Sequence, residues 1–248
     1  KMKRKYVSDG SGPVPKHSAS SGPQCSIGID FGTSRTGYAY AFKKKNGENP
    51  EIFIREPGGQ DASKTNTVLL LDQKLRFLAF GSKALDAYYD DNKDGTHLLI
   101  EKFKMGLHQK ENGGEPQATA LNGRKLPLLD VITKSLQYIK DEAIREVNSS
   151  QMVPVKLDEI QWLVTVPAIW SDVAKGIMRR AAFRAGLIQD ESSDRLALAL
   201  EPEAACVACE AENEALRKGH RFMVLDCGGG TVDITMHLVA EKKPHLLL

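Results

Sequence analysis

The sequence has little cysteine and no long hydrophobic run. Four cysteines among 248 residues are too few for a disulfide scaffold, and three of them stand in apolar contexts typical of buried free thiols in a reducing intracellular compartment. The longest apolar runs are VLLL (68–71) and LALAL (196–200). Because a membrane helix needs roughly 18 apolar residues, we expect no integral membrane protein and no membrane partner.

An excess of charge of one sign is also missing. Lys and Arg number 34 and Asp and Glu 32, which gives a formal net charge of +2. Dedicated nucleic-acid-binding proteins usually show a strong basic excess, so we expect no nucleic-acid partner. The charged and hydrophobic fractions, 27% and 41%, are those of an ordinary globular protein with one large domain or two small ones.

Familiar metal and nucleotide signatures are incomplete. Cys206 and Cys209 have CxxC spacing, but no second such pair or nearby histidine pair completes a metal site, so packing on a helix is the favoured interpretation. The stretch GGQDASKT (58–65) has Ser63 where a phosphate-binding P-loop requires glycine. No G-x-G-x-x-G follows a predicted strand, which argues against a dinucleotide fold.

The first 24 residues differ from the rest of the chain. A basic cluster at 1–5 is followed by a segment rich in Ser, Gly and Pro. No apolar segment follows the cluster, so it is not a secretory signal. We expect a solvated, disordered tail or a cloning remnant in a cytoplasmic protein, with a nuclear address as the alternative.

Hydrophobic periodicity predicts an α/β chain. The runs at 26–31 and 36–42 flank the turn GTSR and are typical of a hairpin. A polar excursion is expected at 109–125. Ser171 is a plausible N-cap, and Pro202 suits a first helical turn. The other predicted strands lie at 52–54, 67–71, 160–166, 196–200, 221–226 and 232–239, and the predicted helices at 81–90, 128–147, 171–185 and 202–217.

Two segments share the order strand, Asp, glycine turn, Thr, strand. The first is DFGT (30–33) and the second DCGGGTVD (226–233). Glycine permits close backbone approach, so the exposed N–H groups and threonine hydroxyls would hold phosphate oxygens, while the carboxylates would orient Mg²⁺ through its retained waters. The first turn alone is typical of a plain hairpin, but the repeat favours phosphate binding.

Four motifs in this order resemble the nucleotide-binding domain of the heat-shock-70 chaperone family, within the actin-like ATPase superfamily. They are SIGIDFGTSRTG (26–37), LVTVPAIW (163–170), LEPEAA (200–205) and LDCGGGTVDIT (225–235). The residues in these motifs most resemble those of a divergent branch of that family. The resemblance covers about residues 25–240. It implies a ribonuclease-H-like lobe with a mixed sheet and flanking helices at 25–220, and an incomplete second lobe at 221–248.

The resemblance also assigns residues to a site. Asp30, Asp226 and Asp233 would surround Mg²⁺ and the attacking water, with Asp30 and Asp226 holding the metal through water. Lys102 matches the catalytic lysine, Glu201 the glutamate that orients water, and Pro167 a switch toward partners. The residues expected to contact phosphate are Gly32, Thr33, Ser34, Gly228, Gly229, Gly230 and Thr231.

Without the resemblance to the family, two of these residues have ordinary structural explanations. A lysine such as Lys102 is usually a solvated charge, and Glu201 before a proline is usually a helix cap. Two departures put ordinary chaperone coupling in doubt: Arg35 replaces an aromatic residue, and Lys175 replaces the arginine beside the switch.

The implied function is Mg-ATP binding, with slow hydrolysis to ADP and phosphate in a longer parent protein that has a chaperone or stress-response role and co-chaperone or client partners. The alternatives are a nucleotide-sensing scaffold without turnover and a small-molecule kinase of the same superfamily, although Lys102 and Glu201 argue against the kinase. Because the second lobe is short here, we expect that this chain alone binds nucleotide weakly, shows little turnover, and either aggregates or depends on a partner.

Overall fold

The computed structural model describes residues 22–44, 50–55, 63–91, 95–108, 115–212 and 216–240. Most of the predicted tail at 1–24 and the final HLLL lie outside these residues. The proposed boundary between a first and a second lobe at residue 220 stays a prediction.

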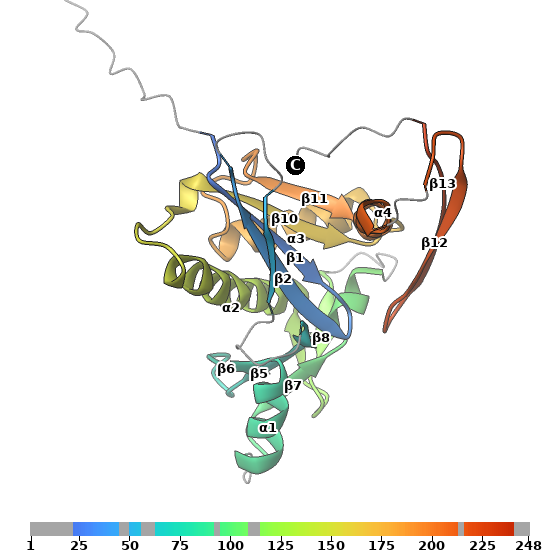
Figure 1. Ribbon diagram of the computed structural model, residues 1–248. Coiled ribbons are helices and arrows are strands. Elements are labelled where there is room, and N and C mark those ends of the chain that lie inside the picture. Colours follow the sequence, from blue (N-terminus) through green and yellow to red (C-terminus); the bar gives the residue numbers. More distant parts are fainter. Residues whose placement is uncertain are drawn as a thin grey trace, which may run out of the picture.

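A mixed sheet forms the centre of the molecule (Figure 1). Its strand order is β11-β10-β1-β2-β3, and the short β4 also pairs with β2. β1 runs parallel to β10 and antiparallel to β2, and β10 runs parallel to β11. The predicted hairpin and three other predicted strands of this sheet are confirmed: β1 (Cys25–Phe31), β2 (Arg35–Phe42), β3 (Ile52–Arg55), β10 (Ile160–Val166) and β11 (Leu196–Leu200), to which the structure adds β4 (Thr65–Asn66). The predicted strand at 67–71 is confirmed as β5 (Val68–Leu71), which lies in a separate sheet.

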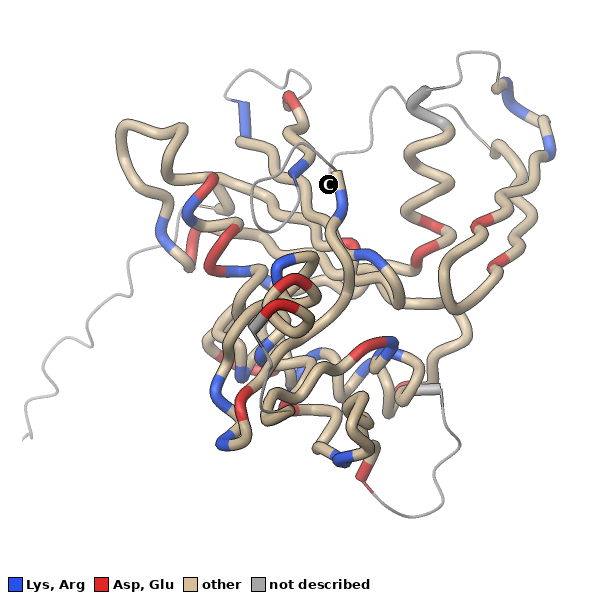
Figure 2. The backbone as a smooth tube through the Cα atoms, turned by 90° about the horizontal axis from the view of Figure 1, so that it is seen from below, with Lys and Arg blue, Asp and Glu red and all other residues tan. Residues whose placement is uncertain are grey.

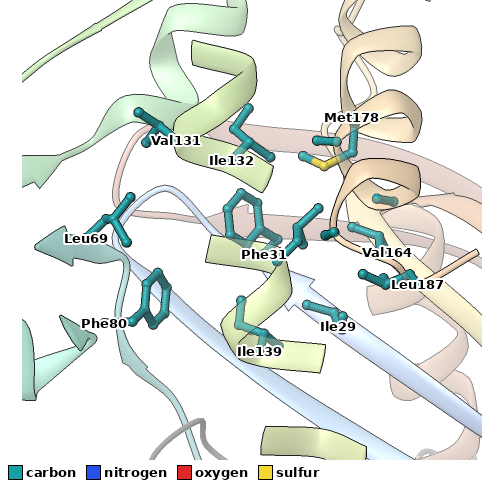
Figure 3. Packing of buried hydrophobic residues seen from close by; sticks show 14 of the residues in the cluster. Ile29, Phe31, Leu69, Phe80, Val131, Ile132, Ile139, Val164, Met178 and Leu187 are labelled. Atoms are coloured by element: carbon teal, nitrogen blue, oxygen red, sulfur yellow. The ribbon is translucent and has the colours of Figure 1, made fainter. Parts of the chain in front are cut away.

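Two helices pack against each other and bury one face of this sheet. Helix α2 (Leu128–Ser149) buries side chains at three- and four-residue steps, which is the periodicity seen in its sequence. Helix α3 (Asp172–Arg184) begins after Ser171, whose Oγ accepts a hydrogen bond from the Ala174 N–H at 3.3 Å, so the predicted N-cap is confirmed. Phe31 of β1 lies among Ile132 of α2 and Met178 of α3 in this core (Figure 3).

A smaller layer lies below the central sheet in Figure 1. The sheet β6-β5-β7 carries helix α1 against it, and a two-stranded hairpin, β8-β9, which the sequence pattern did not predict, begins within the polar excursion and ends just after it. A 3₁₀ helix, η1, follows β7 directly. The bounds are β6 (Phe77–Phe80), α1 (Ser82–Asp91), β7 (Leu98–Glu101), η1 (Phe103–His108), β8 (Gln117–Thr119) and β9 (Lys125–Pro127), and a second 3₁₀ helix, η2 (Leu157–Glu159), precedes β10.

The C-terminal part is helix α4 (Glu201–Glu212) and an antiparallel hairpin of β12 (Arg221–Cys227) and β13 (Val232–Leu238), which stands beside α4 and apart from the central sheet (Figure 1). The predicted helix end at residue 217 is wrong, because Arg217 is not helical and its N–H bonds the His220 ring at 3.3 Å. One face of the hairpin is apolar and exposed: Met223, Leu225, Val232, Ile234, Met236 and Leu238.

The cysteine expectation needs a correction. Cys25 is buried in the first strand, and burial raises its pKa to about 11. Cys206 is half-buried, while Cys209 and Cys227 are exposed, because α4 and the hairpin present these positions away from the main core. Among the described helices, none is long and apolar enough to cross a membrane. Basic and acidic residues are interspersed along the described chain (Figure 2).

Candidate functional site

Each Asp-Gly-Thr segment forms the turn of a hairpin. Asp30 is the second-last residue of β1, and its partner across the pair is Gly37 of β2. Asp226 has the same place in β12, and its cross-strand partner is Asp233. The second turn is closed by the Gly228 N–H, which donates to the Thr231 carbonyl at 2.9 Å. Each hairpin therefore carries a carboxylate directly before a glycine-containing turn.

The two turns lie in direct contact, although they come from opposite ends of the chain. A Cβ atom at Gly229 would overlap the Ser34 hydroxyl oxygen and lie 2.5 Å from the Ser34 Cβ. A Cβ at Gly230 would lie 2.7 Å from Thr33 Cγ2 and 2.9 Å from Met105 Sδ. Only glycine fits this approach without displacing the first turn. The consecutive glycines thus have a role in packing as well as in any phosphate binding.

Asp30 is held by partners from two other segments. Thr165, near the end of β10, donates a hydrogen bond from Oγ1 to Asp30 Oδ1 at 3.0 Å. Lys64 Nζ donates to the other carboxylate oxygen, Oδ2. Because β1 and β10 are parallel neighbours, Asp30 and Thr165 reach the same end of the sheet. Pro167 follows β10 directly and is buried, and its carbonyl accepts a hydrogen bond from the Trp170 N–H at 3.3 Å.

A buried lysine lies at the centre of the site, and it is not the lysine selected from the sequence. Lys104, in η1, is 1% exposed, and its Nζ lies 2.6 Å from Glu201 Oε1 at the start of α4. The same ammonium lies 5.2 Å from the ring centroid of Trp170. Burial of a lysine requires such a counter-charge, and the aromatic face adds a cation–π contact.

Lys102 has a different environment. It is exposed and has a positive φ of 49°, at the junction between β7 and η1. The structure therefore brings Lys104, rather than Lys102, to Glu201. Sequence reasoning missed Lys104 because the two lysines flank Phe103 and no pattern separates them. The sequence carried no signal for Lys104, because its contacts with Glu201 and Trp170 form only in the folded chain.

The carboxylates of Glu201, Asp30 and Asp233 interact electrostatically in the site. The pKa of Glu201 is raised, first because of burial; the ammonium of Lys104 opposes this rise, and the charges of Asp30 and Asp233 add to it. Asp233 is buried, and Asp226 is half-buried on the same hairpin. The structure thus gathers Asp30, Asp233, Glu201 and Lys104 around the contact between the two turns.

The phosphate-binding candidates are distributed over the two turns. Thr33 is buried, whereas Gly32, Ser34 and Thr231 are half-buried, and Gly228, Gly229 and Gly230 are exposed. Within the described ranges, no group of three or more His, Cys, Asp or Glu side chains is arranged to enclose a metal ion. Any Mg²⁺ here would be held by one or two carboxylates and by water or substrate oxygens.

No family model matches the chain. It is 32% identical over 278 residues to human heat shock 70 kDa protein 12A, with 89% of this chain and 41% of that protein covered. It is 32% identical over 281 residues to human heat shock 70 kDa protein 12B, with 88% and 40% covered. The chain is a relative of the heat shock 70 kDa proteins 12A and 12B.

This relationship confirms the recognised branch and the ribonuclease-H-like fold expected from it. A weaker similarity extends to the chaperone protein HscA homolog of Rickettsia typhi, at 24% identity over 221 residues, with 88% of this chain and 33% of that protein covered. The chain spans about two fifths of the length of human protein 12A.

Proposed function

We propose that this chain is the nucleotide-binding part of a heat-shock-70-like protein and that its two glycine turns hold the phosphates of a Mg²⁺-bound adenine nucleotide. The contact between the turns supports this proposal most directly. Gly229 and Gly230 lie against Ser34 and Thr33, so that two sets of backbone N–H groups and threonine hydroxyls meet in one place. Successive backbone N–H groups in turns of this kind form concavities that bind anions.

The carboxylates fit the metal that such a nucleotide needs. Mg²⁺ usually keeps several waters and is bound by one or two carboxylates together with phosphates, which suits Asp30 and Asp226 better than a site enclosed by protein ligands. When bound, the ion would neutralise phosphate charge. Asp30 would orient its water shell, and Thr165 would fix the orientation of Asp30.

We assign to Lys104 the role that the family motif suggested for Lys102. Lys104 Nζ is fixed between Glu201 and Trp170, so a positive charge stands in place beside the two turns before any substrate arrives. Such preorganised charge is what stabilises phosphoryl transfer. Glu201 and Asp233 would hold and orient the attacking water. Pro167, between Thr165 and Trp170, would transmit the nucleotide state to partner proteins.

Equilibrium binding of a fluorescent ADP analogue, with and without Mg²⁺, tests the proposal. Asp226→Asn should weaken Mg²⁺-dependent binding by at least about tenfold, because a charge-assisted contact of about 1.5 kcal/mol is lost. Glu203→Gln, at an exposed position of α4, is the matched control and should bind like the wild type. Equal Mg²⁺-dependent binding of the analogue by the wild type, Asp226→Asn and Glu203→Gln would contradict the proposal.

A single-turnover measurement with ATP separates hydrolysis from sensing. We expect slow release of phosphate that is lost in Lys104→Met and kept in Lys102→Met. Binding without any turnover would favour the nucleotide-sensing scaffold over the ATPase, and transfer of phosphate to a small molecule would favour the kinase.

A further inference from the structure

The position of Lys64 is fixed by the segment that follows it. Thr65 and Asn66 form β4, which pairs with the start of β2 directly after the first glycine turn. The Thr67 N–H donates to the Ser34 carbonyl at 2.9 Å, and Thr67 Oγ1 donates to the Gly32 carbonyl at 2.8 Å. Residues 64–67 are therefore joined to the first turn by strand pairing and by a buried hydroxyl.

Two further contacts direct the side chain of Lys64. Arg35 Nη2 donates to the Lys64 carbonyl at 2.7 Å. A Cβ at Gly37 would lie 2.9 Å from Lys64 Cγ, so the lysine stem crosses β2 at a residue without a side chain. Gly37 is the cross-strand partner of Asp30, and the ammonium of Lys64 consequently reaches the Asp30 carboxylate.

Both oxygens of Asp30 are then engaged. Oδ2 accepts from Lys64 and Oδ1 accepts from Thr165. The Lys64 and Asp30 side chains are 45% and 40% exposed, so their ion pair is hydrated and reversible. A partly exposed pair of this kind can be exchanged for another cation without unfolding its surroundings.

We propose that Lys64 is a built-in competitor of the divalent cation at Asp30 and thereby sets the Mg²⁺ concentration that the site requires. The proposal rests on the proposed function for the assignment of Asp30 as a metal-binding carboxylate. The ion, or one of its waters, needs the carboxylate oxygen that the ammonium occupies. Arg35 contributes to this competition because its guanidinium anchors the Lys64 carbonyl.

Titration of the 248-residue chain with Mn²⁺ alone, followed by water-proton relaxation, tests the competition without nucleotide. Lys64→Gln should lower the apparent Kd for Mn²⁺ by up to about fivefold, the factor that corresponds to an exposed ion pair of about 1 kcal/mol. Lys64→Arg keeps the charge, and Lys74→Gln changes an exposed lysine in another turn; both should stay near the wild-type value. Melting temperatures of all four proteins check that each is folded.

A second arm measures the Mg²⁺ concentration that gives half of the maximal binding of a fluorescent ADP analogue, which Lys64→Gln should lower by a similar factor. Equal or weaker Mn²⁺ binding by Lys64→Gln, or no Mn²⁺ binding by any of the proteins, would overturn the competitor role. Weaker binding of ADP to Lys64→Gln than to the wild type in EDTA would also overturn it, because that result would show that Lys64 contacts phosphate. Failure of the wild type to bind ADP would instead overturn the proposed function, while the Mn²⁺ arm still decides the role of Lys64.

Discussion

Replacing Lys104 by methionine keeps the buried stem but removes the cation that Glu201 contacts. Breaking a buried ion pair typically costs about 3 to 5 kcal/mol, because the remaining charge has no partner. The Glu201 side chain is 15% exposed and can take up a proton, so we expect a smaller loss, about 2 to 3 kcal/mol. For a chain of this size, the melting temperature should fall by about 4 to 12 °C.

The pH dependence of this loss identifies its cause. Without Lys104, nothing opposes the burial and the neighbouring Asp30 and Asp233 that raise the pKa of Glu201, so its folded-state pKa rises further above the unfolded value. A group with a raised folded-state pKa stabilises the protein at low pH and loses this contribution as pH rises through that pKa. The difference in melting temperature between wild type and Lys104→Met should therefore be smaller at pH 5 than at pH 7.

Lys102→Met is the matched control for this experiment. Lys102 is exposed, so its replacement should change the free energy of unfolding by less than about 0.5 kcal/mol. The double variant Lys104→Met/Glu201→Gln should recover part of the loss and its pH dependence. Thermal unfolding followed by circular dichroism measures all four proteins, and equal melting temperatures for Lys102→Met and Lys104→Met would refute the reasoning.

Three further predictions concern packing. Gly229→Ala forces a side chain into the contact between the turns, which adds about 1 to 2 kcal/mol of strain. It should therefore lower the melting temperature by about 2 to 8 °C and weaken ADP binding. An unchanged melting temperature and an unchanged ADP affinity would contradict the contact. At pH 8 iodoacetamide should modify Cys227 well before Cys25, because a pKa of about 11 leaves only about one Cys25 thiol in a thousand ionised; mass spectrometry of the alkylated peptides decides it. The exposed apolar face of the hairpin should cause concentration-dependent association that Leu225→Lys/Ile234→Glu reduces, as measured by light scattering, whereas equal association would place the contact elsewhere.

Much of the fold could be predicted because its elements have strong local patterns. The period of two in β1 and the three- and four-residue steps in α2 both match the buried faces. The hairpin β8-β9 escaped prediction because its strands have only three residues each, too few to show an alternating pattern. The end of α4 was misplaced because apolar and charged residues continue through 216–217 although the helix does not.

The site was less predictable because it depends on contacts over long distances in the sequence. The motif repeat indicated both turns, since each carries its own Asp, Gly and Thr. The pairing of Lys104 with Glu201 joins residues 97 positions apart, and no local signal distinguishes Lys104 from Lys102. The contact of Lys64 with Asp30 likewise depends on how β4 pairs with β2.

Hydrogen exchange of the backbone amides, measured with and without Mg-ADP, tests most directly whether the two turns together hold the phosphates. The account predicts that Mg-ADP slows exchange at Gly32 to Ser34 and at Gly228 to Thr231 within the same titration, while amides of β8-β9 stay unchanged. Protection of only one turn, or of neither while the nucleotide is bound, would contradict it.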